Sequence, residues 1–494
     1  MARKKYLIGV DSGTQGTKVI ICDEYGNIVS QGSAVHEPIF QLQPGWQEQH
    51  PEDNWAKLCQ ASRQALDGLD APKTDIVAIG LTGQRGTATL VDRSGQALRP
   101  FITWLDTRSL GVGSWLRENE PEIVEKAYKL TSVQGWLTRL LTGEFKDCVS
   151  YPPVGPLMVN VLLNWPDDSF SFEAYGMPRE KLMDIVPPGT VYGRVTREAA
   201  EATGLPEGVP VVAGAGDKQC EVLGGGAVGR GQAYVTYGTL SSALMIAYDR
   251  AIISNCGAYY TLGAAVPGAW SPETSVRGHW MVTWFRDEFC RDLIAKAQEC
   301  GLPPEELLNR EAERVPPGSE GLVVFPYWDA RPSKSEAKGL ILGFYNGLHR
   351  RPHVFRAILE GIAYGLREGI EHFAADSGVP ITSVTVGGGG SKSDIGMQAS
   401  ADIFGVPCRR PHTAETSGLG AAIEAAVGIG LYSTYDEAVK HMTRAEAVFE
   451  PNPKNQELYD AIYQRVFSKI YPSLEQVFVS LNEIAQHTLI RMPD

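Results

Sequence analysis

The clearest pattern of apolar and polar positions lies near the start of the chain, in the stretch YLIGVDSGTQGTK of residues 6–18. An apolar run ends at Asp11, a Gly-Thr turn follows, and a second β-branched run comes next, which predicts strand, tight turn and strand. Gly13 and Gly16 let backbone N–H groups face an anion, and the Thr14 hydroxyl adds a donor. The turn could therefore hold phosphate, with Asp11 placed to hold a phosphate-bound Mg²⁺ through water. An ordinary hairpin is the alternative, because Gly-rich turns between apolar runs are common.

A second copy of this pattern lies in the other half of the chain. Residues 232–248, QAYVTYGTLSSALMIAY, again predict strand, hydroxyl-rich turn and strand. Gly238 and Thr239 stand where Gly13 and Thr14 stand in the first copy. Two phosphate hairpins in two similar halves indicate a nucleotide clamped between duplicated lobes. A Gly-x-x-x-x-Gly-Lys-Ser/Thr phosphate loop and a credible dinucleotide fingerprint are both missing from the sequence.

Strands and helices alternate along the rest of the chain. Short apolar runs predict buried strands at 76–81, 209–213 and 383–386. Apolar residues at helical spacing predict helices at 52–69 and 354–373. This alternation indicates an α/β fold. A chain of 494 residues is too long for one ordinary core, so two large domains are expected.

Polar side chains follow the first of these buried strands, at the strand end where ligands bind in parallel sheets. Gln84 and Arg85 can donate hydrogen bonds to sugar hydroxyls, although each taken singly is more typical of a solvated loop residue. Farther along, Trp104 offers a flat apolar face on which the C–H side of a polyol could stack. Asp106 and Arg108 could bind the same ligand, but a structural ion pair is the slightly favoured interpretation.

A single carboxylate among small residues follows the strand at 209–213, in the sequence GAGDKQ. The small residues leave room for a substrate at Asp217, which makes this residue the candidate general base. A positioned carboxylate can take a hydroxyl proton as phosphoryl transfer proceeds, an effect typically worth ~10²- to 10⁴-fold in rate. Asp217 could instead be a helix N-cap, or it could serve both purposes.

Four glycines at 387–390 follow the strand at 383–386 and allow an aromatic base to approach the backbone closely. This loop is a candidate adenosine site, and residues 391–394 begin the helix beyond it. A flexible linker is the weaker alternative, because a buried strand and an amphipathic helix flank the glycines directly. The small-residue stretch 416–431 predicts a helix that could pack tightly behind the loop, and the stretch 266–274 is predicted to be loop-like.

Charge and cysteine usage narrow the class of protein. The formal net charge of -13 argues against nucleic acid or an anionic membrane as the main partner, because either would favour a basic face. The eight Cys residues contain no Cys-x-x-Cys pair and are expected to be reduced, mostly buried thiols. No apolar stretch is long enough to span a bilayer, and the short N-terminal apolar run stops at Asp11, as in a strand and unlike a signal peptide. We therefore expect a cytoplasmic protein.

Taken in order, these motifs resemble those of the FGGY carbohydrate kinases, which belong to the sugar-kinase, heat-shock-protein and actin superfamily. The matching stretches are DSGTQGTK, GLTGQR, TWLDTR, AGAGDKQ, TYGT, ILEGIAYGLREG and GGGGSKSDIGMQASADIFGVP, and they cover most of the chain. The resemblance implies two ribonuclease H-like lobes of the actin-like ATPase fold around a central cleft. It also implies ATP with Mg²⁺ and transfer of the γ-phosphate to a sugar or polyol hydroxyl.

The resemblance further implies roles for single residues. Asp217 falls on the catalytic base, and Asp11 and Asp217 fall on the acids linked to the metal. The implied nucleotide contacts are Thr14, Gln15, Lys18, Gly238, Thr239, Gly388, Gly389, Gly390 and Asp394. The implied substrate contacts are Gln84, Arg85, Trp104, Asp217 and Lys218.

From this resemblance we expect an N-terminal lobe at 1–227 with the sugar site and the catalytic Asp, and a C-terminal lobe at 228–494 with the adenosine site. The last helices could pack back on the first lobe. The expected substrate is a pentulose such as xylulose or ribulose, ahead of glycerol, erythritol or another polyol. A non-catalytic nucleotide-binding sensor on the same fold is a further alternative, and a homodimer is left open.

The sequence departs from its relatives in ways that affect the choice of substrate. Glycerol kinases follow the arginine with Glu where this chain has Gly86, and xylulokinases usually have Met-His where Arg85 and Gly86 stand. Neither named substrate therefore carries over directly. Around residues 109–115 the chain also looks shorter than its relatives, which could admit a different sugar or reduce activity.

Overall fold

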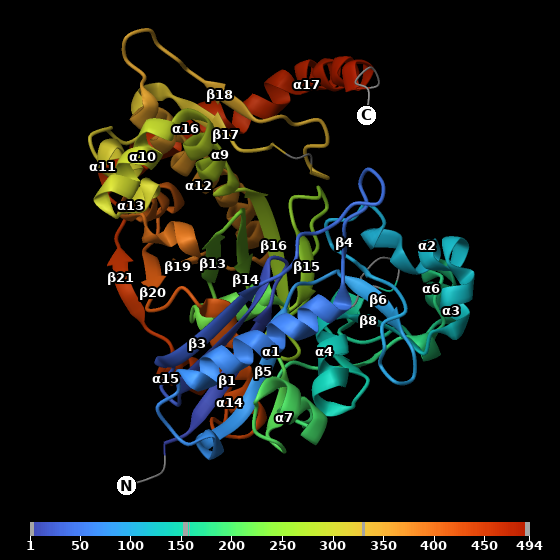
Figure 1. Cartoon of the computed structure of the whole chain (residues 1–494). Coiled ribbons are helices and arrows are strands. Elements are labelled where there is room, and N and C mark those ends of the chain that lie inside the picture. Colours follow the sequence, from blue (N-terminus) through green and yellow to red (C-terminus); the bar gives the residue numbers. More distant parts are fainter. Residues whose placement is uncertain (1–3, 152–156, 158, 329–330, 490–494) are drawn as a thin grey trace.

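Two large sheets, each covered by helices, dominate the computed structural model, which describes residues 4–151, 157, 159–328 and 331–489 (Figure 1). The expected α/β fold is confirmed. The first sheet contains six strands in the order β11 (Val191–Arg194), β12 (Pro210–Ala213), β5 (Ile76–Gly83), β1 (Tyr6–Ser12), β2 (Gly16–Asp23) and β3 (Ile28–Val35). The second contains seven, in the order β15 (Tyr260–Gly263), β16 (Trp270–Arg277), β14 (Leu240–Met245), β13 (Gln232–Tyr237), β19 (Ser383–Gly387), β20 (Cys408–Pro411) and β21 (Ala445–Phe449).

The two sheets repeat one pairing pattern. In the first sheet, β3, β2 and β1 are antiparallel, β1, β5 and β12 are parallel, and β11 is antiparallel at the edge. In the second sheet, β16, β14 and β13 are antiparallel, β13, β19 and β20 are parallel, and β21 is antiparallel at the edge. The duplication suggested by the two Gly-Thr turns therefore extends to whole sheets, with β15 as an added edge strand of the second.

Three smaller sheets and the helices complete the fold. The smaller sheets pair β4 (Glu48–Gln49), β7 (Phe101–Ile102), β6 (Ala88–Val91) and β8 (Lys129–Ser132); β10 (Asp184–Val186) and β9 (Lys146–Cys148); and β17 (Val323–Phe325) and β18 (Leu340–Leu342). The helices up to the second sheet are α1 (Pro51–Asp67), α2 (Val112–Asn119), α3 (Pro121–Lys126), α4 (Val133–Thr142), α5 (Val159–Leu162), α6 (Ser169–Tyr175), α7 (Arg197–Thr203) and α8 (Asp217–Gly224). The later helices are α9 (Trp280–Phe289), α10 (Arg291–Cys300), α11 (Pro304–Ala312), α12 (Arg351–Ser377), α13 (Asp394–Phe404), α14 (Thr416–Gly428), α15 (Tyr435–Met442), α16 (Pro453–Ile462) and α17 (Ser468–Leu489).

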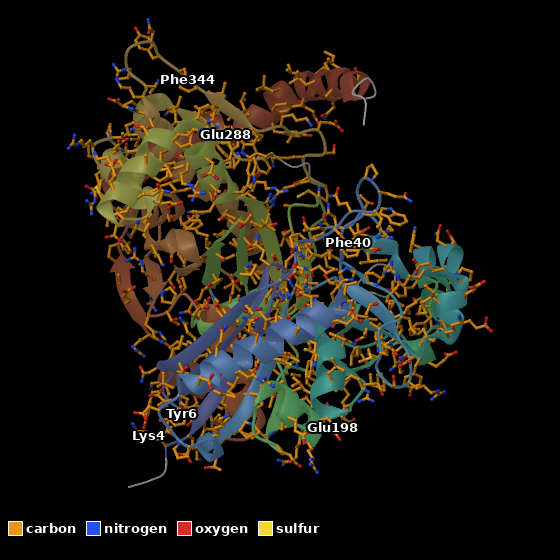
Figure 2. All side chains as sticks on the ribbon, in the orientation of Figure 1. Lys4, Tyr6, Phe40, Glu198, Glu288 and Phe344 are labelled. Atoms are coloured by element: carbon orange, nitrogen blue, oxygen red, sulfur yellow. The ribbon has the colours of Figure 1, made fainter. Side chains whose placement is uncertain are left out.

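The predicted helices at 52–69 and 354–373 correspond to α1 and α12. Helix α1 covers β2 and β3 of the first sheet, and α12 packs on β14 and β16 of the second (Figure 1). Side chains fill the space between strands and helices in both halves (Figure 2). Tyr6, at the start of β1, and Phe344, beyond β18, lie at opposite ends of the molecule (Figure 2).

Helix α14 joins the two halves. It packs against α8, β1 and β5, that is, against the first sheet, and not behind the Gly-rich loop as expected. Glycine makes this approach possible, because a Cβ at Gly9 would lie 1.9 Å from the Gly418 carbonyl oxygen and one at Gly420 would lie 2.0 Å from the Cys220 carbonyl oxygen. A helix late in the chain therefore closes over the strand that carries Asp11.

The final helices belong to the second half. Tyr459, Tyr463, Phe467 and Phe478 are buried in the same core as α12 and the second sheet. In the described part of the chain, these side chains of the last helices therefore pack in the second core, and a return of the helices to the first lobe stays a prediction.

The cysteines and the apolar character of the helices also bear on the predictions from composition. All eight cysteines lie in the described part of the chain as free thiols, and five of them are buried, which confirms the prediction. Among the described residues, no helix combines the length and apolar character needed to cross a membrane.

Candidate functional site

The first Gly-Thr turn joins β1 to β2 as predicted. Ser12 lies opposite Thr17 in the strand register, and the Gly13 N–H donates to the Gly16 carbonyl at 3.0 Å. The Thr14 Oγ1 accepts a hydrogen bond from Trp104 Nε1 at 2.9 Å and donates to Gln84 Oε1 at 3.3 Å. The hairpin is therefore bonded to the residues predicted to contact the sugar.

Two further residues of this hairpin have partners outside it. The Gln15 side chain is exposed, and its carbonyl accepts from the His36 N–H at 2.9 Å. Lys18 lies opposite Asp11 in the register, and its Nζ forms an ion pair with Glu415 Oε2 at 2.6 Å. A phosphate contact by Lys18 would therefore compete with Glu415.

Asp11 is the residue before the last of β1, which ends at Ser12. Its Oδ1 is buried and has no hydrogen-bond partner. Burial, and after it the nearby Asp217 carboxylate, raises the pKa of Asp11 from its usual value to about 7. A buried carboxylate with a second acid nearby is stabilised by a cation that enters between them.

Asp217 is the first residue of α8, and Gly216 before it is the N-cap. Asp217 is therefore not the N-cap of α8, as the alternative had it, but the residue after the N-cap. Asp217 Oδ1 accepts from the Lys218 backbone N–H at 2.8 Å and from Arg85 Nε at 3.0 Å. A Cβ at Gly216 would lie 2.3 Å from Arg85 Cδ, so glycine is needed for Arg85 to reach this carboxylate. The Asp217 side chain remains 25% exposed, which leaves it open to a ligand.

Lys218 directs its ammonium to the next turn of α8. Its Nζ pairs with Glu221 Oε1 at 2.6 Å. Burial alone would lower the pKa of Lys218, but the Glu221 and Asp217 carboxylates outweigh it and hold this pKa above its usual value. Lys218 therefore stays charged, and a substrate contact through Nζ would be shared with Glu221.

Sequence reasoning missed a residue of the second sheet that completes this cluster. The Glu273 carboxylate accepts from Arg85 Nη1 at 2.8 Å and from Nη2 at 3.2 Å, and its side chain is 1% exposed. The stretch 266–274 was expected to be loop-like, but residues 270–277 form strand β16. That expectation is wrong because the strand WSPETSVR buries polar side chains, among them Glu273, so the usual apolar signal is weak.

The other predicted sugar contacts differ in their access to a ligand. Trp104 is 41% exposed and can offer a ring face. Gln84 is 2% exposed, and its amide is bonded to Gln49, Thr14 and Thr87, so Gln84 mainly orients the hairpin. Its direct contact with a substrate stays a prediction.

Asp106 and Arg108 form the structural pair that the sequence slightly favoured. Arg108 donates to Asp106 at 2.8 and 2.6 Å and to Glu48 at 2.7 Å. Its guanidinium also lies over the rings of Trp46 and Trp115, at 3.7 and 4.5 Å from their centroids. The pair anchors the loop that presents Trp104.

The second Gly-Thr turn, Gly238 and Thr239, joins β13 to β14 and is held by the start of α9. The Gly238 carbonyl accepts from the His279 N–H at 2.9 Å, and the Thr239 carbonyl accepts from the Gly278 and Trp280 N–H groups at 3.2 and 3.3 Å. Backbone hydrogen bonds from neighbouring segments therefore hold both Gly-Thr turns in place.

The predicted adenosine loop lies directly beside this second turn. Gly388 has φ +79°, and a Cβ there would lie 2.8 Å from the Tyr237 carbonyl oxygen at the end of β13. A Cβ at Gly390 would meet His279 Nε2 at 2.0 Å, whereas a Cβ at Gly389 would meet nothing within 4 Å. The loop therefore packs against the hairpin at its two flanks and leaves open space at its centre.

Asp394 begins α13 after this loop. Its carboxylate is 77% exposed and pairs with Arg410 at 2.5 Å. Any nucleotide contact by Asp394 would therefore involve the exposed edge of the loop.

A family model described as the FGGY family of carbohydrate kinases, C-terminal domain, matches residues 233–429. The corresponding N-terminal domain model matches residues 6–114 and 112–224, in two segments that meet where the chain was expected to be shorter than its relatives.

Individual proteins agree with these models along almost the whole chain. The chain is 35% identical over 470 residues to the uncharacterized sugar kinase YgcE of Escherichia coli, covering 94% of this chain and 93% of that one. It is 30% identical over 481 residues to a glycerol kinase of Leifsonia xyli, covering 88% and 92%. Among solved structures, ligand-bound xylulose kinase from Lactobacillus acidophilus superposes with a TM-score of 0.83 at 21% identity, covering 97% and 100%.

Proposed function

Because the chain belongs to the FGGY family of carbohydrate kinases, we propose that it transfers the γ-phosphate of ATP to a hydroxyl of a small sugar or sugar alcohol, with a pentulose such as xylulose or ribulose as the leading candidate. The observation that carries the proposal is the position of Asp217. Its carboxylate is bonded to Arg85, and the same guanidinium is bonded to Glu273 of the second sheet. An acid at the junction of the two sheets, and still 25% exposed, is where an acceptor hydroxyl and a phosphate can meet.

A polyol such as glycerol or erythritol is the second candidate. It is favoured by the 30% identity to a glycerol kinase over most of both chains. Arg85 is common to this chain and the glycerol kinases, but Gly86 removes the acid that follows it there. The acceptor site is therefore expected to differ from a glycerol site at this position.

The proposed nucleotide site consists of the two Gly-Thr turns and the Gly-rich loop. Backbone N–H groups of turns such as 13–16 and 238–239 suit phosphate oxygens, because they are fixed donors without a charge of their own to desolvate. The open space over Gly389 suits the flat face of a base. With this site, residues 1–227 and 228–494 would act as two lobes that share one nucleotide.

The Asp11 carboxylate fits a role in holding Mg²⁺. Its buried Oδ1 has no partner, and a nearby acid disfavours its charge, so a cation would relieve both conditions. In the described part of the chain, no group of three or more His, Cys, Asp or Glu side chains could hold a metal by itself. That fits Mg²⁺, which usually keeps several waters and binds one or two carboxylates together with substrate phosphates. When bound, the ion supplies positive charge that offsets the charge of the phosphates.

In the proposed phosphoryl transfer, one side chain of this protein, Asp217, accepts the hydroxyl proton. The acceptor hydroxyl oxygen forms a bond to the γ-phosphorus as the bond from that phosphorus to the β-phosphate oxygen breaks. The hydroxyl proton passes to the Asp217 carboxylate. Arg85 keeps that carboxylate in place through its Nε, so the oxygen that accepts no bond from Arg85 or Lys218 is free to face the hydroxyl.

The test is a panel of ketoses, polyols and aldonates with ATP and Mg²⁺, followed by coupled detection of ADP. We expect at least one neutral sugar or polyol to stimulate ADP release well above the sugar-free rate. Nucleotide binding without stimulation by any member of the panel would support the non-catalytic sensor and contradict the proposal.

A further inference from the structure

Arg85 is the cation nearest the proposed base, and all three of its nitrogen atoms already bind carboxylates. Nε donates to Asp217 at 3.0 Å, while Nη1 and Nη2 donate to the two oxygens of Glu273 at 2.8 and 3.2 Å. Each Nη keeps one further N–H, because a guanidinium has five donors in all. Arg85 can thus still donate to a substrate, but its charge is already matched by two negative charges.

Glu273 cannot easily leave this arrangement. Its strand β16 lies between β14 and β15, and Glu273 itself is in register with Leu244 on one side and Tyr260 on the other. The side chain is 1% exposed, and a buried charge separated from its partner is strongly destabilising. The bidentate pair is therefore a fixed part of the site.

The formal charges around the proposed acceptor position are negative in sum. Asp217 and Glu273 contribute two negative charges and Arg85 one positive charge, and the neighbouring Lys218 is paired with Glu221. A substrate carboxylate placed against Arg85 would meet Glu273 and Asp217 as like charges, which is costly. A neutral hydroxyl can donate to these carboxylates and accept from Arg85, so it suits the site.

We infer that Glu273 determines substrate charge: by occupying both Nη groups of Arg85, it makes the acceptor site select neutral ketoses and polyols and reject aldonates. The inference rests on the proposed function for the location of the acceptor, and it extends that function to the class of substrate. The exposed rings of Trp104 and Tyr260, the latter beside Glu273 in the sheet, add apolar surface suited to the C–H face of a neutral sugar.

The test is Glu273→Gln, compared with the unmodified protein and with Glu360→Gln. Glu360 is a matched control, because its carboxylate is also buried and also pairs with an arginine, Arg356, at 2.9 Å, but inside the core of the second half. For each protein, kcat/KM is measured for the best neutral substrate and for gluconate and xylonate. Calorimetric binding of the same compounds is measured without nucleotide.

We expect Glu273→Gln to raise the ratio of aldonate to neutral-substrate kcat/KM by at least about tenfold, in line with the removal of a like charge at contact distance. Glu360→Gln should leave this ratio unchanged. Glu273→Asp, which keeps the charge, should keep the preference for neutral substrates and covers the case in which Glu273→Gln does not fold. An unchanged ratio in folded Glu273→Gln, or an unmodified protein that uses aldonates as well as neutral sugars, would overturn the inference.

The binding measurements separate this inference from the proposed function. A protein that binds neutral sugars in preference to aldonates, and loses that preference in Glu273→Gln, supports the role of Glu273 even if no ADP is released. The absence of ADP release would then count against phosphoryl transfer alone. Equal binding of gluconate by the unmodified protein and Glu273→Gln would count against the role of Glu273.

Discussion

Trp104 Nε1 donates a hydrogen bond to Thr14 Oγ1 at 2.9 Å, across 90 residues of sequence. Trp104 is the exposed aromatic residue of the proposed sugar site, and Thr14 belongs to the first Gly-Thr turn, the proposed phosphate contact. The Thr14 carbonyl also accepts from Gln49 Nε2 at 2.7 Å. The proposed sugar contact and the proposed phosphate turn are therefore joined by direct hydrogen bonds, and displacement of one side chain should shift the other.

This bond predicts energetic coupling between the two residues. Trp104→Phe removes the N–H and keeps an aromatic ring, and Thr14→Val removes the acceptor and keeps the shape. In a double-mutant cycle on kcat/KM for ATP, the two changes should be non-additive by about 0.5–1.5 kcal/mol, the usual net value of one hydrogen bond.

A second cycle serves as the control for this coupling. Trp136 Nε1 donates to the Gly95 carbonyl at 2.9 Å and has no bond to Thr14, so Trp136→Phe and Thr14→Val should add. If the Trp104 cycle were also additive, the hydrogen bond would contribute nothing to nucleotide use.

Asp217 as general base predicts a specific kinetic defect. Asp217→Asn keeps the acceptor oxygen for Arg85 but cannot take the hydroxyl proton, so kcat should fall about 10²- to 10⁴-fold while ATP still binds. The measurement is coupled ADP release together with calorimetric ATP binding. Asp184→Asn is the control, because Asp184 forms an exposed ion pair with Arg179 at the surface. Near-normal turnover in Asp217→Asn would rule out the base assignment.

The sequence predicted those parts of the site whose structure depends on residues that are adjacent in the chain. The two Gly-Thr turns follow from apolar runs interrupted by glycine, and the position of Asp217 follows from a strand end flanked by small residues. Both signals arise from residues that are neighbours in the chain. The expected strands and the long helix at 351–377 were recognisable for the same reason.

Glu273 could not be predicted in this way, because its role depends on a partner 188 residues away. Its strand is polar and contains Pro272, both features that argue against a buried strand in sequence reasoning. Glu273 can be buried there because its carboxylate meets the Arg85 guanidinium of the first half. The packing of α14 on β1 was missed for a similar reason, since it depends on glycine contacts between distant segments.

The raised pKa of Asp11 predicts a pH-dependent effect on stability. Its pKa in the folded protein is about 7, above the ordinary value of 3.8, so folding favours the protonated form. The associated stability is fully present below about pH 4 and is lost as the pH rises through about 7. Asp11→Asn, which cannot ionise, should therefore raise the free energy of unfolding more at pH 8 than at pH 5, by about 2–3 kcal/mol without metal. Urea unfolding at the two pH values measures this difference.

The same carboxylate predicts that affinity for Mg²⁺ and nucleotide rises from pH 5.5 to about 7 and then levels off, because protonated Asp11 must lose its proton to attract the cation. Asp147 provides the control: burial raises its pKa to about 7 as well, but it lies in β9, which packs on α4, and its hydrogen-bond partners are Ser132 and Cys148. Asp147→Asn should share the effect on stability and leave the pH dependence of Mg²⁺ affinity unchanged. If Asp11→Asn also left that pH dependence unchanged, Asp11 would not be the metal-linked acid.

Two adjacent glycines of the proposed adenosine loop predict opposite outcomes. At Gly388 the backbone has φ +79°, and a Cβ would lie 2.8 Å from the Tyr237 carbonyl oxygen, so Gly388→Ala should lower the free energy of unfolding by about 1 kcal/mol or more. At Gly389 a Cβ would meet nothing within 4 Å, so Gly389→Ala should change stability by less than about 0.5 kcal/mol. If the base lies flat over Gly389, the added methyl group should nevertheless weaken ATP binding about tenfold, because it would occupy the space of the base. Thermal unfolding and calorimetric ATP binding of both variants distinguish a change in the loop from a change in the ligand site. A Gly389→Ala variant that binds ATP with unchanged affinity would place the base elsewhere.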